Sequence, residues 1–210
     1  MNLLIIIIAI TAIISYYGFQ NFSFFEKYKF NVGAVRHRKE YIRLLSSGFL
    51  HADMMHLIFN MLTLYFFGDD VILNFGKAAF IIIYIGSILV GNLFTLFYYK
   101  HQSWYSAIGA SGGVSGILFA SVVINPFTSI NFIPGFIFGA IYFGYSVYQM
   151  INPQQNDNIG HAAHLGGAAF GLVYAVATVP EMAISNALYL GIMAIPLLYL
   201  AYEIFVKKKK

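Results

Sequence analysis

Long apolar runs dominate the chain, and short polar segments separate them. Charged side chains are absent from residues 78–99, 102–156, 158–180 and 182–202. Because one membrane crossing needs about 20 predominantly apolar residues in a helix, each run can hold one or two crossings. The pattern predicts helices at residues 3–19, 54–68, 78–99, 110–125, 132–150, 160–179 and 185–205. The expected fold is therefore an all-α, polytopic membrane helix bundle.

Composition supports the membrane class and narrows the possible chemistry. Hydrophobic residues make up 60% of the 210 residues and charged residues only 10%, whereas a soluble domain carries about 25% charged residues. The chain has no cysteine, which excludes disulfides, thiolate metal sites and a cysteine nucleophile. The run at residues 3–19 lacks a basic flank and a clear cleavage site, so we expect a retained helix.

Most of the cations lie in two clusters outside the predicted spans. The net charge is +4, and the clusters are Arg36, Arg38, Lys39 and Arg43 in the connection 20–49 and Lys207–Lys210 at the C-terminus. Cations beside apolar spans favour anionic lipid headgroups. The expected partner is therefore the lipid bilayer and not nucleic acid. A second polar connection, at residues 152–158, is interpreted as a mobile cap.

Several histidines and one amide lie within or beside the apolar spans. His51, His56 and Asn60 lie in "HADMMHLIFN", and His161 and His164 lie in "GHAAHLGG". Such side chains are costly at membrane depth unless they have a partner or meet water, so each is a functional candidate. Hydrogen bonds between helices also explain them. Histidines three or four residues apart are, in addition, a metal-ligand pattern.

The segment "GASGGVSG" at residues 109–116 is rich in glycine where an apolar helix begins. Each glycine weakens a helix interior by about 1 kcal/mol relative to alanine. Close helix packing in lipid explains the glycines, but it does not explain Ser111. A serine at a helix N-terminus lies near unpaired N–H groups that can stabilise an oxyanion. A neutral histidine is the usual base for such a serine.

Three segments occur in order on three separate spans: "HADMMHLIFNM", "GASGG" and "GHAAHLGGAAFGL". Together they resemble the rhomboid intramembrane serine proteases, over about residues 43–172. The resemblance implies a rhomboid-like six-helix core, which we place at residues 1–180. An additional C-terminal transmembrane helix and the basic tail follow at residues 181–210.

Carried over position by position, the resemblance makes Ser111 the nucleophile and His164 the general base of a dyad that needs no metal or other cofactor. Asn60 and His56 correspond to the residues that line the oxyanion hole with the Ser111 N–H group. The implied activity is hydrolysis of peptide bonds in or near transmembrane segments of membrane proteins. Those proteins are the expected substrates, and a substrate helix would enter laterally near the fifth span.

The glycines that match the rhomboid pattern have supporting roles. Gly109 and Gly112 would let a substrate backbone reach Ser111. Gly167 and Gly171 correspond to the glycines that let the sixth span approach the fourth, which brings the base to the nucleophile.

Two positions depart from the rhomboid pattern. Arg43 corresponds to an arginine that follows tryptophan in the first loop, but Ile42 precedes it here. Ser115 stands where some members carry an aromatic residue that packs on the catalytic histidine, so other packing must hold His164. His51, in contrast, matches a histidine with a more structural role.

Two other classes of protein stay open. A catalytically inactive rhomboid relative would share the fold, but it would be expected to lack the nucleophile or the base. A metal- or haem-binding membrane protein would use His51, His56, His161 and His164. The sequence assigns no role to Ser115 or His161, and Asp157 is interpreted as a loop residue.

The expected location is an integral, multi-pass position in a bacterial cytoplasmic membrane. The rhomboid topology places the N-terminus in the cytoplasm and, after seven spans, Lys207–Lys210 outside. The cations of the connection 20–49 favour the opposite orientation under the positive-inside rule. We keep the orientation that the motifs imply for the core.

Overall fold

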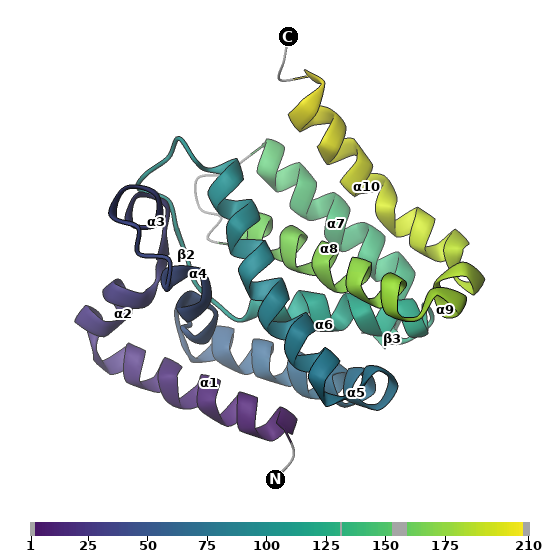
Figure 1. The fold of residues 1–210 in the computed structure, drawn as a ribbon, viewed down its shortest axis with the longest axis horizontal. Helices are drawn as coiled ribbons and strands as arrows, with labels where there is room; N and C mark the ends of the chain where they lie inside the picture. The colour runs from purple at the N-terminus through teal and green to yellow at the C-terminus, as the bar shows by residue number, and fades with distance from the viewer. Residues whose placement is uncertain (1–2, 131, 153–158, 208–210) are drawn as a thin grey trace.

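The computed structural model describes residues 3–130, 132–152 and 159–207, which form a bundle of helices (Figure 1). The predicted all-α class is confirmed, because β-structure in the described residues consists of two pairs of two-residue strands. The start of the helix Leu3–Gln20 and the end of the helix Ala187–Phe205 lie on opposite sides of the bundle (Figure 1).

Helices make up most of the regular structure in the described residues. They are α1 (Leu3–Gln20), α2 (Phe22–Tyr28), α3 (Val32–Arg38), α4 (Arg43–Ser46), α5 (Met54–Tyr98), α6 (Ser111–Ile124), α7 (Gly135–Ile151), α8 (His161–Thr178), α9 (Pro180–Ser185) and α10 (Ala187–Phe205). A 3-10 turn, η1 (Ser47–Phe49), follows α4. The antiparallel strand pairs are β1 (Phe30–Asn31) with β2 (Ser106–Ala107), and β3 (Ser129–Ile130) with β4 (Ile133–Pro134).

The predicted spans correspond to α1, the two halves of α5, α6, α7, α8 and α10. By length and composition α1, α5 and α10 are apolar enough to cross a membrane, and α6 and α7 are shorter apolar helices. The prediction that the second helix ends at residue 68 is wrong, because α5 continues and bends only at Gly76, where φ is +84°. Asp69 and Asp70 are exposed, so their charges do not end the helix.

Two other segments contain short helices that the prediction lacks. The span predicted at residues 185–205 corresponds to α10, and the separate short helix α9 precedes it. Asn186 lies between the two helices, and its Nδ2 group donates to the Val123 carbonyl oxygen, 3.1 Å away, near the end of α6. The long connection 20–49 contains α2, β1, α3 and α4. The side chains of Asn21 and Asn31 cap α2 and α3 at their N-termini, which satisfies main-chain N–H groups there.

The centre of the bundle is formed by α6, α8 and the second half of α5. Residues 112–123 of α6 are all buried, as expected for a helix surrounded by others. The main chains of α6 and α8 touch: a Cβ on Gly167 would lie 2.1 Å from the Gly112 carbonyl oxygen, and one on Gly171 would lie 2.1 Å from that of Gly116. Small residues four apart on both helices permit this approach.

Two outer helices support this centre. Helix α1 packs on the first half of α5, where Leu4 fills the space beside Gly68. Helix α10 runs along α7 (Figure 1), and its buried Met193 lies against Gly139. In both contacts a large side chain of the outer helix fills the space beside a glycine of the inner helix, so the two helices pack closely.

We expect Gly167→Ala to destabilise the protein, because the added methyl group would overlap the main chain of α6. Overpacking of this kind costs about 1–3 kcal/mol. Gly191→Ala is the matched control, since Gly191 also lies inside a helix and a Cβ there meets no atom within 4 Å. Thermal unfolding of the purified variants in detergent measures the difference. Equal midpoints for Gly167→Ala and wild type would contradict the contact.

Candidate active site

Ser111 and His164 come from distant parts of the chain and meet at the starts of two packed helices. Ser111 is the first residue of α6, and His164 lies in the first turn of α8. Ser111 Oγ and His164 Nε2 are 2.6 Å apart, and both side chains are half-buried. When the hydroxyl donates, the imidazole accepts at Nε2, which is the arrangement that a general base requires.

The turn before Ser111 depends on glycine at position 109. Gly109 has a φ of +118°, which residues with a Cβ rarely adopt. A Cβ there would also lie 2.8 Å from His56 Cε1 and 3.5 Å from Ser111 Oγ. The Gly109 N–H group donates to the Ser47 carbonyl oxygen, 3.0 Å away. The turn is therefore held in place and leaves room beside the Ser111 hydroxyl.

His51 holds the next residue of this turn. The Ser15 hydroxyl, on α1, donates to the Phe49 carbonyl oxygen at 2.9 Å, so Ser15 Oγ accepts from His51 Nδ1 at 2.8 Å. With its proton on Nδ1, buried His51 accepts the Ala110 N–H group at Nε2, 3.3 Å away. His51 therefore positions the main chain immediately before Ser111.

Asn60 and His56 lie one helical turn apart at the start of α5. Asn60 is buried, and its Nδ2 group donates to the His56 carbonyl oxygen at 2.9 Å, a bond that uses one of the two amide N–H groups. The His56 ring packs edge-on against His51, with ring centroids 4.9 Å apart. Asp53 caps the helix by accepting the His56 N–H group at 2.8 Å. The start of α5 is thus fixed beside Gly109.

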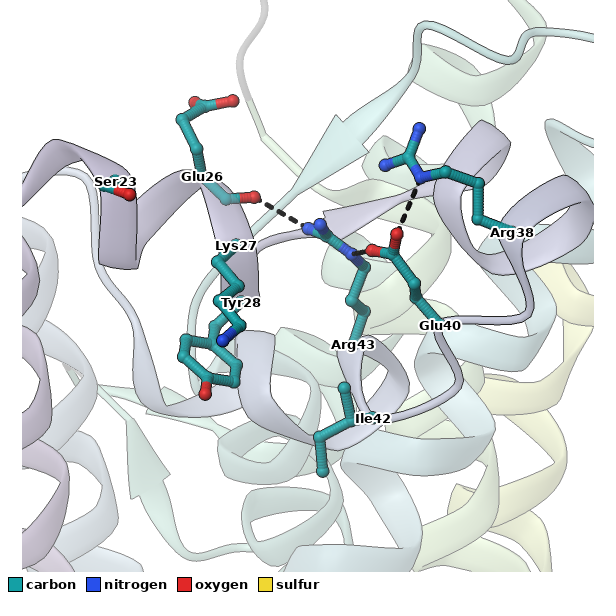
Figure 2. Close-up of a pocket in the computed structure, with 8 residues that line it drawn as sticks. All are labelled: Ser23, Glu26, Lys27, Tyr28, Arg38, Glu40, Ile42 and Arg43. Carbon is teal, nitrogen blue, oxygen red and sulfur yellow. Dashed lines mark hydrogen bonds and ion pairs between the residues drawn. The ribbon is translucent and has the colours of Figure 1, made fainter.

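Arg43 anchors the first connection (Figure 2). It is buried, and its Nη1 group donates to the carbonyl oxygens of Glu26 and Lys29 at 2.8 and 2.7 Å. These carbonyls lie at the C-terminal end of α2, where a cation is favourable. Arg43 also pairs with Glu40, which pairs with Arg38 at 2.6 Å. The connection is therefore anchored although no tryptophan precedes Arg43.

A surface pocket of about 550 Å³ lies beside these ion pairs, between α2 and residues 38–43 (Figure 2). Neither Ser111 nor His164 lines it. The pocket therefore belongs to the outer face of the first connection and not to the serine–histidine pair.

Ser47 and Asn92 link the first connection to the core. Asn92, in the second half of α5, is buried, and its Nδ2 group donates to the Leu44 carbonyl oxygen at 2.8 Å and to Ser47 Oγ at 3.0 Å. The Ser47 carbonyl oxygen in turn accepts the Gly109 N–H group. Hydrogen bonds thus join α5, the first connection and the turn before Ser111.

Four residues of the site were not predicted from the sequence: Ser15, Ser47, Asn92 and Tyr142. Ser15 and Asn92 are polar residues within apolar spans, so the signal that singled out the histidines could have found them. Tyr142 of α7 stacks on the His164 ring, with centroids 5.9 Å apart. An aromatic residue in an apolar run carries no such signal, and only the fold brings it to His164.

His161 is the first residue of α8 and lies against α7. His161 is buried, and its Nδ1 atom lies 3.4 Å from Ser146 Oγ on α7. Within the described ranges, no group of three or more histidine, aspartate or glutamate side chains is placed to hold a metal ion. Asp157 and the rest of the predicted cap after Asn152 lie outside the described residues.

The fold and the site define a class: a multi-pass helical membrane protein with a serine–histidine pair at the starts of two packed helices. The Rhomboid domain family matches residues 38–181, a range that includes both members of the pair. This match covers more than half of the chain, so the chain belongs to the rhomboid family.

Several relatives are similar over much of this region. RHOMBOID-like protein 12, mitochondrial, of Arabidopsis thaliana is 28% identical over 150 residues, which cover 62% of this chain and 44% of that protein. Rhomboid protein 1, mitochondrial, of Saccharomyces cerevisiae is 29% identical over 140 residues, covering 63% and 40%. YdcA of Bacillus subtilis is 28% identical over 144 residues, covering 69% of each chain. The chain thus matches less than half the length of the first two relatives.

The Glu40 carboxylate gives the first connection a pH-dependent contact. Hydrogen bonds from Arg38 and Arg43 hold its pKa below the ordinary value of 4.5. The contact therefore stabilises the fold fully above pH 4.5 and is lost as the pH falls through the lower pKa of the folded state. Wild type should unfold at a higher temperature than Glu40→Gln at pH 7, and the two should converge in acid.

Circular dichroism of the helices can follow this unfolding. Because Glu40→Gln carries no titratable group at this position, it is the reference at every pH. A difference in midpoint that stays constant from pH 7 into the acid range would show that the carboxylate does not make this contact.

Proposed function

We propose that this protein is an intramembrane serine endopeptidase that hydrolyses peptide bonds in or near transmembrane segments of membrane proteins. Membership of the rhomboid family supports an intramembrane protease-like function, but the family includes inactive members. The observation that carries the finer assignment is the 2.6 Å distance between Ser111 Oγ and His164 Nε2. A serine and a histidine at this distance have the geometry of an activated nucleophile and its base.

In the proposed reaction, Ser111 Oγ bonds to the carbonyl carbon of the scissile peptide while His164 Nε2 accepts the hydroxyl proton. His164 then returns this proton to the departing amine as the C–N bond breaks, leaving an acyl ester on Ser111. A water molecule attacks the ester with His164 again as the base, which releases the second product and regenerates the serine.

The tetrahedral intermediate carries a negatively charged oxygen that needs hydrogen-bond donors. We assign the Ser111 N–H group to this role, because it lies at the positive end of the α6 dipole. Asn60 can offer the amide N–H group that its bond to the His56 carbonyl oxygen does not use. The His56 ring lies against Gly109, beside Ser111, and is the third proposed donor.

The expected surroundings and substrates follow from the fold class. The apolar helices make this a multi-pass membrane protein, so the bilayer is its partner. We propose that a transmembrane segment of the substrate approaches near α7, the route that the rhomboid resemblance implies. A location in a bacterial cytoplasmic membrane stays a prediction, since named relatives include mitochondrial proteins. The division of the chain at residue 180 also stays a prediction.

Ser111→Ala and His164→Ala should each abolish cleavage of a transmembrane model substrate in liposomes. Removing either member of such a pair costs on the order of 10⁴- to 10⁶-fold in rate. Neither variant should react with a fluorophosphonate, which labels activated serines. Both should keep the wild-type thermal midpoint, which separates lost chemistry from lost fold.

Cleavage that persists in Ser111→Ala would contradict the assignment of the nucleophile. Stoichiometric metal or haem in the purified wild type, with no cleavage, would favour a metal- or haem-binding membrane protein instead. Wild type that binds transmembrane segments without cleaving them would favour an inactive rhomboid relative.

Asn60→Ala should lower the cleavage rate by about 10²- to 10³-fold without abolishing it, which is the usual effect of losing one oxyanion donor. Asn74→Ala is the matched control. Asn74 makes the same kind of bond on α5, from Nδ2 to the Asp70 carbonyl oxygen at 2.8 Å, but it is exposed. Asn74→Ala should cleave at the wild-type rate, and a wild-type rate in Asn60→Ala would remove Asn60 from the oxyanion site.

A further inference from the structure

An aromatic side chain of α7 lies on the imidazole that we propose as the base. Helices α7 and α8 lie side by side (Figure 1). The rings of Tyr142 on α7 and His164 on α8 stack, with centroids 5.9 Å apart and an angle of 21° between their planes. The torsion that rotates a histidine ring has no sharp intrinsic minimum. The contacts of the ring, among them the packing on its face and the hydrogen bond to Ser111, therefore set the plane in which its Nε2 atom points.

The Tyr142 ring is itself held from several directions. Its hydroxyl lies 2.7 Å from Ser115 Oγ, one turn after Ser111 on α6. The ring also packs on Phe119 of α6 and on Phe138 of α7, with centroids 5.6 and 5.9 Å apart. One tyrosine thus connects the helix of the nucleophile with the ring of the base.

A second contact between α7 and α8 lies in the same turn of α8. The Tyr145 ring packs edge-on against His161, with centroids 5.4 Å apart. Ser146 Oγ lies 3.4 Å from His161 Nδ1. Side chains of α7 therefore contact both histidines of "GHAAHLGG", and the start of α8 is docked on α7 at two points.

We propose that Tyr142 is the positioning residue of the base: it fixes the plane of the His164 ring, and the Ser115 hydroxyl fixes Tyr142. This inference rests on the proposed function of Ser111 and His164. In some rhomboid proteins an aromatic residue at the position of Ser115 does this packing. Here the small Ser115 leaves space, and α7 fills it. The orientation of the base consequently depends on the position of α7.

Purely structural packing is the competing explanation, because Tyr142 lies in an aromatic cluster with Phe119 and Phe138. In that case, loss of the cluster would lower the stability of the fold and would reduce every activity of the protein alike. A positioning role, in contrast, changes the turnover step and the environment of His164. The test therefore needs readouts that stability alone does not move.

The first readout is the rate at which a fluorophosphonate labels Ser111, together with kcat and KM for a transmembrane model substrate. Tyr142→Leu should lower kcat and the labelling rate by about 10- to 100-fold with little change in KM, because misplacing a reacting group by about 1 Å costs up to 10²-fold. Tyr142→Phe and Ser115→Ala remove the same hydrogen bond, so they should share a smaller loss of about 3- to 10-fold. Tyr148→Leu, at an exposed position of α7, is the control and should match wild type.

A double variant tests whether the cleavage rate depends on the presence of an aromatic ring beside His164 or on the helix that carries the ring. Ser115→Tyr combined with Tyr142→Ser moves the ring from α7 to α6 and keeps the side-chain volume. It should recover much of the rate that Tyr142→Ser alone loses. A double variant with the rate of Tyr142→Ser, at an equal thermal midpoint, would overturn the positioning role.

The second readout does not depend on catalysis. The chain has six histidines, and the ring signals of His164 in isotope-labelled full-length protein can be assigned by their loss in His164→Gln. Tyr142→Leu should shift these signals, while those of His37 and His101 stay in place. Unchanged His164 signals, or a lower thermal midpoint with unchanged kcat, would overturn the inference. Wild type that neither cleaves nor labels would refute the proposed function, and the His164 signals would still decide whether Tyr142 orients the ring.

Discussion

The direct contact between the main chains of α6 and α8 is the constraint on which the site depends. Gly112 follows Ser111 immediately, and Gly167 lies three residues after His164. A Cβ on Gly167 would lie only 2.1 Å from the Gly112 carbonyl oxygen. Helices in lipid associate through close packing and not through the hydrophobic effect. The glycines therefore allow the two main chains to approach, and the van der Waals contacts between these main chains stabilise the helix pair. The 2.6 Å distance between the serine oxygen and the histidine nitrogen exists because the two helices are this close.

The other side of the nucleophile is fixed by polar groups of the first connection. A turn that ends at Ser111 leaves main-chain N–H groups outside any helix, and in an apolar environment each needs an acceptor. Ser47 and His51 supply acceptors to Gly109 and Ala110. Both acceptors belong to the segment that Arg43 and Asn92 hold to α2 and α5. The folded connection thus provides hydrogen-bond acceptors for main-chain N–H groups of the turn that a transmembrane bundle alone would leave unpaired.

Sequence patterns predicted most of the apolar spans, and two of the three motifs contain the serine and the histidine that the fold brings together. Spans and motifs can be recognised because both depend on residues close together in the chain. Sequence patterns failed where distant residues decide the outcome. Exposure of Asp69 and Asp70 lets α5 continue to Gly76, and the bond from Asn186 to the end of α6 fixes the turn before α10. The sequence around Ile42 and Arg43 does not predict that the arginine donates hydrogen bonds to main-chain carbonyl oxygens at the end of α2. The serine at position 115 indicates that another residue must pack on His164, but only the fold shows that Tyr142 stacks on its ring.

Helix α10 bears on the site although it lies beyond the residues that match the Rhomboid domain. Its Met193 is fully buried against Gly139, which precedes Tyr142 by one turn of α7. A Cβ on Gly139 would meet both Met193 and Phe119, and Phe119 is one of the rings that pack on Tyr142. Because interiors are packed without voids, the absence of a side chain at Gly139 and the presence of Met193 together set how closely α7 lies on α6. The C-terminal helix therefore takes part in placing the tyrosine that contacts the proposed base.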